Sequence, residues 1–248
     1  MRTLLVLMLV LVLGHAACGQ SRRDSLIAQL PNAKDALQRL HLLSSICSLS
    51  DPDGRYSLAT IHLADSLIMH GHAHDTTVLV SKGDALWQFG YYRFDPGPDR
   101  NEDSAFHYYK RASEAYAASG DERCIAFAAS NIARFYIDRG DAREALRLVR
   151  SALPVHEKWH NAAMLIKDHG NLARAYYALG DLERSIDQQQ LALRYAEEKH
   201  AVSDGAAILH NIGTIYKDEG QLDTASAYFS RAIAAFKSGN DAPDRCIM

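Results

Sequence analysis

The sequence predicts an all-α protein that folds as an α-α superhelix, a solenoid of antiparallel helix pairs. The main observation is a segment written three times in strict register, as SNIARFYIDRGDAREAL from Ser130, GNLARAYYALGDLERSI from Gly170 and HNIGTIYKDEGQLDTAS from His210. Self-similarity at a fixed period of about 20 to 50 residues is typical of solenoids and other repeat architectures. A second observation is that only six prolines and fifteen glycines interrupt 248 residues, which favours helices over many short strands.

Each repeat is predicted to hold two helices separated by a glycine. In the first helix, Ile132, Ala133 and Tyr136 fall at i, i+1 and i+4 and share one face. The glycine ends this helix because it tolerates a left-handed conformation, and an aspartate at the start of the second helix complements the helix dipole. The recurring residues are the small residues Ala133, Ala173 and Gly213, the tyrosines Tyr136, Tyr176 and Tyr216, the glycines Gly140, Gly180 and Gly220, and the aspartates Asp141, Asp181 and Asp223.

The second helix of each repeat carries its own stripe of residues at i, i+4 and i+7, which we expect to pack on the first helix. The three stripes are Ala145, Val149 and Ala152, then Ser185, Gln189 and Ala192, then Ala225, Phe229 and Ala232. In this order of small residue, tyrosine, glycine and second stripe, the chain resembles the tetratricopeptide repeat family. The 40-residue spacing resembles the extended form found in kinesin light chains, cell-polarity adaptors and many bacterial signalling proteins.

The resemblance continues toward the N-terminus. Tyr109 keeps the repeat spacing relative to Val149, but Gly83 and Gly90 lie ten positions too early relative to Ala133 and Gly140, which predicts a ten-residue insertion. The insertion is a surface loop or a lip on a binding groove. The predicted organisation is a signal peptide at 1–19, a degenerate helical repeat or cap at 20–74, a repeat at 75–120 with a loop insertion at 91–100, repeats at 121–160, 161–200 and 201–240, and a tail or the start of a further repeat at 241–248.

The first nineteen residues are typical of a secretory signal peptide, so we expect an exported protein of the periplasm or cell envelope. Arg2 precedes an apolar run from Leu4 to Leu13, which small residues follow. The run is too short to span a bilayer, which takes about twenty apolar residues. Cleavage after Gly19 fits this pattern. Acylation of Cys18 as a lipoprotein is the alternative, although His15 stands where lipoprotein signals usually carry a leucine-like residue.

Composition excludes several classes of function. The net charge of −3 and the lack of a basic patch argue against binding to nucleic acid or to anionic lipid. We therefore expect membrane association only through a lipid anchor or a segment beyond this sequence. No nucleotide loop or nucleophile motif appears, so we expect neither an enzyme nor a bound cofactor. The separated cysteines Cys47, Cys124 and Cys246 are expected to be small buried residues, with a single disulfide as the alternative.

Three alternating histidines form the one metal-like pattern in the sequence. His70, His72 and His74 are two residues apart, and alternating histidines in a loop can bind zinc or nickel. They lack the i, i+4 spacing of a helical site and have no cysteine partners nearby. We therefore expect a linker between repeats here and assign no metal site.

The family resemblance implies that the first helices line a concave groove that binds a peptide. On this basis we expect groove residues at Asn131, Arg134, Lys167, Asn171, Arg174, His210 and Asn211. In similar proteins the recurring asparagine bonds the main chain of a bound peptide, because an amide both donates and accepts. The alternative is that these asparagines bond a neighbouring helix and fix repeat packing. Two arginines would favour a ligand that carries carboxylates, since guanidinium binds carboxylate through two parallel bonds.

Two functions are consistent with this interpretation. The first is a non-enzymatic scaffold that binds a protein or peptide segment, with acidic segments favoured, in the concave groove. The second is the periplasmic sensory region of a larger membrane-bound signalling protein, either a histidine kinase or a transcriptional regulator. The two share a fold and differ in the segment expected after Met248.

Overall fold

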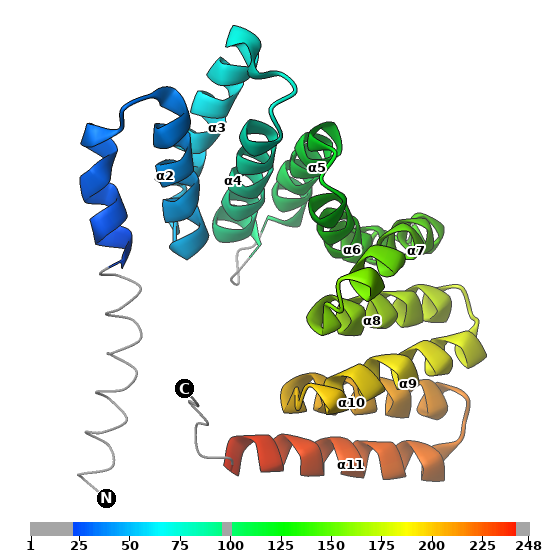
Figure 1. The fold of residues 1–248 in the computed structure, drawn as a ribbon. Coiled ribbons are helices and arrows are strands. Elements are labelled where there is room, and N and C mark those ends of the chain that lie inside the picture. The colour runs from blue at the N-terminus through cyan, green and yellow to red at the C-terminus, as the bar shows by residue number, and fades with distance from the viewer. Residues whose placement is uncertain (1–21, 96–100, 242–248) are drawn as a thin grey trace, which may run out of the picture. The chain divides into compact units, whose positions relative to one another are not determined.

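The computed structural model describes residues 22–95 and 101–241, and every regular element within these ranges is a helix (Figure 1). The predicted all-α fold of consecutive helix pairs is therefore confirmed. The chain divides into two compact units, Met1–Asp121 and Glu122–Met248. The predicted signal peptide with Cys18, the end of the predicted insertion at 96–100, and the tail with Cys246 lie outside the described residues.

The first unit consists of consecutive helices that pack against their neighbours. Residues 22–29 are helical and lead to η1 (Leu30–Asn32), α2 (Ala36–Leu49), α3 (Arg55–Leu67), η2 (Ile68–His72), α4 (Thr76–Phe94) and α5 (Glu102–Ser119). Helix α2 packs on α3 and α4, α3 on α4, and α4 on α5. The core of this unit includes Leu40, Ile46 and Leu86, all with almost no exposed surface.

Helix α4 continues into the predicted insertion. It ends at Phe94 rather than at Gly90, so the predicted loop begins later than the glycine pattern indicates. Gly90 is buried in the helix, where a Cβ atom would lie 3.1 Å from side-chain atoms of Tyr108 and Tyr109 on α5. This glycine allows close packing and does not end the helix. Phe94 extends the contact by stacking on Tyr108, with ring centroids 5.5 Å apart.

The second unit is made, over its described residues, of three helix pairs in the strict register of the sequence repeat. The first helices are α6 (Glu122–Asp138), α8 (Ala162–Ala178) and α10 (Val202–Asp218), and the second helices are α7 (Ala142–Lys158), α9 (Leu182–Glu198) and α11 (Leu222–Asp241). Within each pair the two helices pack together. Helix α7 also packs on α8, and α9 on α10, so consecutive pairs are in contact.

Sequence explains the turn inside each pair. Gly140, Gly180 and Gly220 have φ values of +82°, +78° and +77°, as expected for a left-handed helix end. Asp141 and Asp181 each accept a hydrogen bond of 3.1 Å from the backbone three residues later, so they cap the second helix.

The turn between pairs contains a feature that the sequence pattern does not reveal. His160 and His200 adopt left-handed conformations, with φ of +50° and +54°. Gly120 holds the corresponding place one repeat earlier, with φ of +70°. A residue with a Cβ atom is disfavoured in this conformation, by roughly 1–2 kcal/mol. The repeat therefore fixes the backbone of this turn even where glycine is missing.

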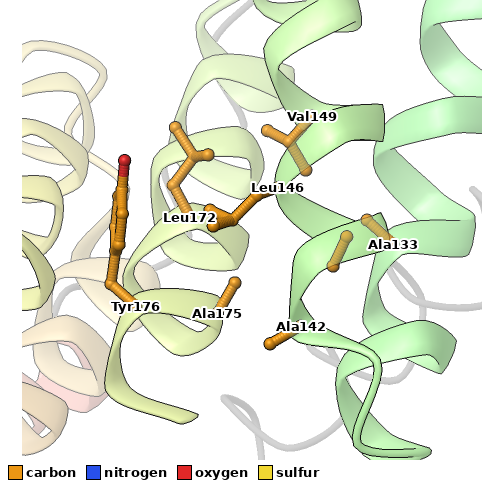
Figure 2. Close-up of a cluster of buried hydrophobic side chains, with 8 residues drawn as sticks. Ala133, Ala142, Leu146, Val149, Leu172, Ala175 and Tyr176 are labelled. Atoms are coloured by element: carbon orange, nitrogen blue, oxygen red, sulfur yellow. The ribbon is translucent and has the colours of Figure 1, made fainter. Parts of the chain in front are cut away.

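A buried cluster joins the first two pairs of the second unit. It contains Ala133, Ala142, Ala145, Leu146, Val149, Leu172, Ala175 and Tyr176 (Figure 2). The alanines from α6 and α7 allow these two helix backbones to approach closely. Leu146 of α7 and Leu172 of α8 fill the space between α7 and α8. Full burial of a leucine or valine side chain contributes about 1.5–3 kcal/mol, so this cluster is a main source of stability.

Candidate functional site

The seven predicted groove residues all lie on the first helices of the second unit. Helix α8 packs on α6, and α10 packs on α8, so these residues come from neighbouring helices. Asn131 and Arg134 are on α6, Lys167, Asn171 and Arg174 on α8, and His210 and Asn211 on α10.

Asn131 takes part in a polar link between α6 and α8. Its Nδ2 donates to the carbonyl oxygen of Phe127 in its own helix at 2.7 Å, and its Oδ1 accepts from Lys167 Nζ at 2.6 Å. Partial desolvation of its ammonium group lowers the pKa of Lys167, and the nearby Arg134 lowers it further. Arg134 itself is half-buried, with its guanidinium carbon 4.5 Å from the centre of the Phe135 ring. Two cationic groups therefore lie close together on this face.

Asn171 is used in the packing of repeats. It is buried, and its Nδ2 donates to the carbonyl oxygen of Ser130 on α6 at 2.7 Å. This bond satisfies a backbone acceptor across the junction of two repeats, which supports the packing interpretation for this asparagine.

Arg174 forms an ion pair across the same junction. Its guanidinium lies 2.7 Å from Asp138 Oδ1 on α6, and both side chains are partly exposed. Partly exposed pairs of this kind contribute about 0–1 kcal/mol, so the pair is a weak structural link. A carboxylate on a ligand would compete with Asp138 for this arginine.

On α10, Asn211 differs from the two earlier asparagines. It is exposed, and its side chain makes no hydrogen bond with any other residue that the structure describes. Beside it, the ring of His210 lies 5.3 Å from that of Phe229, and Thr214 donates to the carbonyl oxygen of His210 at 3.1 Å. Tyr177 on α8 donates to Asp218 on α10 and so links the two helices.

A cavity of about 310 Å³ opens between α8, α9 and α10. It is lined by Arg174, Tyr177, Ser185, Gln189, Asn211, Thr214 and Ile215. Two predicted groove residues, Arg174 and Asn211, are thus brought together at one hollow. The sequence pattern did not mark Tyr177, Ser185 and Gln189 as site residues. A signal was present, since Ser185 and Gln189 are polar residues within a stripe that is apolar in the other two repeats.

A buried polar cluster joins α8 to α6 and α7. His156 Nδ1 on α7 and Asp168 Oδ2 on α8 are 2.6 Å apart, and both residues are buried. Burial raises the pKa of Asp168, while the neighbouring His156 and Ser130 side chains oppose this rise. The three residue types occur in hydrolases, but here all three are buried, and Ser130 Oγ has no hydrogen-bond partner among the described residues. The cluster therefore serves the packing of α6, α7 and α8.

The alternating histidines lie around η2, near the predicted linker. His70 Nδ1 is 2.6 Å from the carbonyl oxygen of Ser66, and His72 Nδ1 is 3.5 Å from Asp75 Oδ2. Among the described residues, no three histidine, cysteine or acidic side chains are grouped so that they could hold a metal ion.

An apolar hollow of about 640 Å³ lies between α10 and α11. Ala206, Phe229, Ala232, Ile233 and Phe236 are among its lining residues. More than half of the surface of Ile233 and of Phe236 is exposed. In the preceding pair the same face of α9 is covered, because Ile208 and Ile212 of α10 pack on Ala192 and Ala196.

A family model for the tetratricopeptide repeat matches residues 124–204 and 161–238. This part of the chain, which reaches into all three pairs of the second unit, therefore belongs to the tetratricopeptide repeat family. The match confirms the family that the recurring residues indicated. A search of curated proteins found no match.

Solved structures with similar folds cover both units of the chain. BtubC (BKLC) from P. vanneervenii is 17% identical, with a TM-score of 0.65, over 93% of this chain and 96% of its own. Aspartyl phosphate phosphatase F from Bacillus subtilis is 23% identical, with a TM-score of 0.58, over 72% of this chain and 46% of its own. MamA from Desulfovibrio magneticus RS-1 is 15% identical, with a TM-score of 0.56, over 85% of this chain and 99% of its own. At these identities the likeness concerns the fold.

One further observation concerns membranes. Within the described ranges, no helix has both the length and the apolar character needed to cross a bilayer.

Proposed function

We propose that the chain is a protein-interaction scaffold that binds a peptide segment on the first helices of its second unit. The tetratricopeptide repeat fold generally serves to bind protein partners, and a helical repeat presents one long surface to them. The observation that carries the proposal is the hollow between α8, α9 and α10, where Arg174 and Asn211 meet. Most of its lining residues carry a hydroxyl, amide or guanidinium group, and Ile215 is apolar, so the hollow can offer several hydrogen bonds to a ligand.

The charges on this face favour a peptide with acidic residues. Arg134, Lys167 and Arg174 contribute three cationic groups from α6 and α8. Arg174 is paired with Asp138 through the 2.7 Å ion pair, so a carboxylate of the peptide would compete with Asp138 for this guanidinium. Because these groups lie close to solvent, the attraction should weaken as salt screens it.

The proposal is tested by selecting peptides from a random library and measuring their dissociation constants. Arg134→Ala with Arg174→Ala should weaken an acidic peptide by about tenfold, since hydrogen bonds to charged groups are worth about 1.5–3 kcal/mol. Arg143→Ala is the matched control, because Arg143 is an exposed arginine on α7, outside the candidate site. The double variant should keep its melting temperature, given the small energy of the exposed pair. A large fall would show that the arginines are structural.

We also propose that the scaffold has no catalytic activity of its own. The serine, histidine and aspartate cluster on α6, α7 and α8 is buried, and phosphatase activity belongs by name to the similar B. subtilis protein, of whose length this chain covers less than half. Turnover of a phosphorylated or ester substrate by purified protein, lost on changing one residue of the hollow, would overturn this proposal.

Export is a further part of the proposal, supported by the apolar run from Leu4 to Leu13 behind Arg2. Mass spectrometry of the mature protein tests it: a chain that begins at Gln20 indicates plain secretion, an acylated Cys18 indicates a lipid anchor, and an intact Met1 contradicts export.

The alternative function is the sensory region of a larger membrane-bound signalling protein. The exposed apolar face of α10 and α11 favours it, since a further repeat would cover the same face that α10 covers on α9. The coding sequence after Met248 tests this alternative, which requires further repeats, a membrane-spanning segment and an output domain.

A further inference from the structure

The hollow between α8, α9 and α10 has an unusual floor. Helix α9 contributes Ser185 and Gln189, both buried. At the places one repeat earlier and one repeat later, the second helices carry Ala145 and Val149, then Ala225 and Phe229. The first position of this stripe is therefore a small apolar residue and the second a larger apolar residue in two of the three pairs described in the second unit. In the pair α8 and α9, both positions carry polar residues.

A polar side chain at a core position is costly unless it is hydrogen-bonded. Ser185 meets this condition, because its hydroxyl donates to the carbonyl oxygen of Ala173 at 2.9 Å. Gln189 does not meet it. Its side chain is 3% exposed, and its Oε1 has no hydrogen-bond partner among the described residues. An unsatisfied buried acceptor costs about 1–3 kcal/mol, so the fold keeps this amide at a loss of stability.

The rim of the hollow holds a second amide without a partner. Asn211 is exposed, and its side-chain amide makes no hydrogen bond within the described part of the chain. Asn171, at the same place one repeat earlier, is buried and bonded to Ser130. Arg174 and Tyr177 pair with Asp138 and Asp218, and the hydroxyls of Ser185 and Thr214 donate to backbone carbonyls. Among the described polar side chains that line this hollow, the two amides are therefore the ones that make no hydrogen bond within the protein.

We infer that this hollow is a specificity pocket for the carboxamide of an asparagine or glutamine side chain in the bound peptide. The inference rests on the proposed function and adds a preference at one position of the peptide. A carboxamide has both donors and an acceptor, so it can complete hydrogen bonds with facing amides. The volume of about 310 Å³ lies at the small end of ligand sites and suits a single side chain.

Other side chains match the floor less well. A carboxylate has no donor for Gln189 Oε1, so it would leave this buried acceptor unsatisfied even where it displaces Asp138 from Arg174. An ammonium group would be buried on an uncharged floor, which costs more than burying a neutral amide. A purely apolar side chain would leave the buried Gln189 Oε1 unsatisfied.

The test uses three blocked amino acids as probes: the N-acetyl methylamides of glutamine, glutamate and methionine. Their binding to the full chain is followed by NMR through the side-chain amide signals of Gln189 and Asn211. The glutamine probe should shift both signals and bind about tenfold more tightly than the other two. Equal binding of the three probes, or no shift of these two signals by the glutamine probe, would overturn the inference.

Two variants separate the pocket from general structure. Gln189→Val copies Val149 and should abolish the preference for the glutamine probe while raising the melting temperature. Gln190→Val is the matched control, because Gln190 is the exposed neighbour on the same helix and should retain the preference. If Gln189→Val keeps the preference, the pocket is wrong. Failure of this test is distinct from failure of the scaffold, because library peptides would still bind the first helices without an amide preference.

Discussion

His156 and Asp168 join α7 to α8 through a hydrogen bond of 2.6 Å between two buried side chains. At the next junction, between α9 and α10, the same repeat positions carry Ala196 and Ile208, which are buried in one apolar cluster. The second unit thus contains a polar and an apolar version of one inter-repeat contact. Ala196 and Ile208 therefore show that an alanine and an isoleucine can occupy these two repeat positions in place of the histidine and the aspartate.

The two versions lead to a prediction about stability. His156→Ala or Asp168→Ile alone leaves one polar side chain buried without its partner, and each should destabilise the protein by about 3–5 kcal/mol. The double variant copies Ala196 and Ile208, and it should be near neutral or more stable by about 1–4 kcal/mol. Urea unfolding of the three variants measures this coupling. Additive losses in the double variant would show that His156 and Asp168 do not act as a pair.

The free energy of unfolding should depend on pH through the titration of Asp168. Burial raises its pKa in the folded protein, so the folded state binds this proton more tightly than the unfolded state does. This contribution is fully present below the ordinary pKa of aspartate, about 3.9, and is lost as the pH rises through the raised value. The free energy of unfolding of the wild type, relative to Asp168→Asn, should therefore fall as the pH increases over that window. A relative rise over that window would contradict the assignment.

Two glycines within helices should respond in opposite ways to alanine. A Cβ on Gly213 would lie 2.7 Å from the ring of Phe229, whereas a Cβ on Gly170 would meet nothing within 4 Å. Gly170→Ala should stabilise by about 0.5–1 kcal/mol through helix propensity, and Gly213→Ala should destabilise by about 1–3 kcal/mol through overpacking. Thermal unfolding measures both.

A compensating change at Phe229 tests the cause. Adding Phe229→Val to Gly213→Ala recreates the pair formed by Ala133 on α6 and Val149 on α7, where both residues are fully buried. The double variant should regain part of the stability lost by Gly213→Ala. If Phe229→Val instead adds to the loss, the ring contact is not the cause.

The two cysteines in the described ranges should differ in reactivity. Burial raises the pKa of Cys47 to about 11, and its sulfur lies 3.4 Å from Thr60 Oγ1. The thiolate is the reactive form, so Cys47 should resist alkylation while the protein is folded. Cys124 is half-buried and should react with iodoacetamide first. Peptide mapping by mass spectrometry, with a urea-unfolded sample as control, decides between them. Equal labelling of the folded protein would contradict the burial of Cys47.

Repetition made the second unit predictable from sequence. In every pair a glycine ends the first helix, at 140, 180 and 220, and a small residue allows close helix packing, at 133, 173 and 213. Because each residue recurs three times, the pattern can be told from a chance match. Gly90 shows the limit of this reasoning. A single glycine is consistent with a helix end or with close helix packing, and the contacts with the Tyr108 and Tyr109 side chains show that Gly90 serves close packing. His160 and His200 were missed because histidine does not by itself predict a left-handed turn.

The candidate site was predictable in part for the same reason. The spacing of Asn131, Asn171 and Asn211 placed them on the first helices, but it did not separate their roles. Those roles depend on what the neighbouring helix offers, such as the Ser130 carbonyl for Asn171. The polar floor of the hollow was visible as Ser185 and Gln189 in an apolar stripe, yet its meaning depended on the missing partner of Gln189 among the described residues.

The binding face is tested most directly by mapping a library-selected peptide onto the second unit through backbone chemical-shift changes in NMR. If the first helices bind the peptide, the changes will cluster on α8 and α10, around Arg174 and Asn211, and weaken in Arg134→Ala with Arg174→Ala but not in Arg143→Ala. Changes confined to the solvent-facing surfaces of α7, α9 and α11 would contradict the claim that the first helices form the binding face.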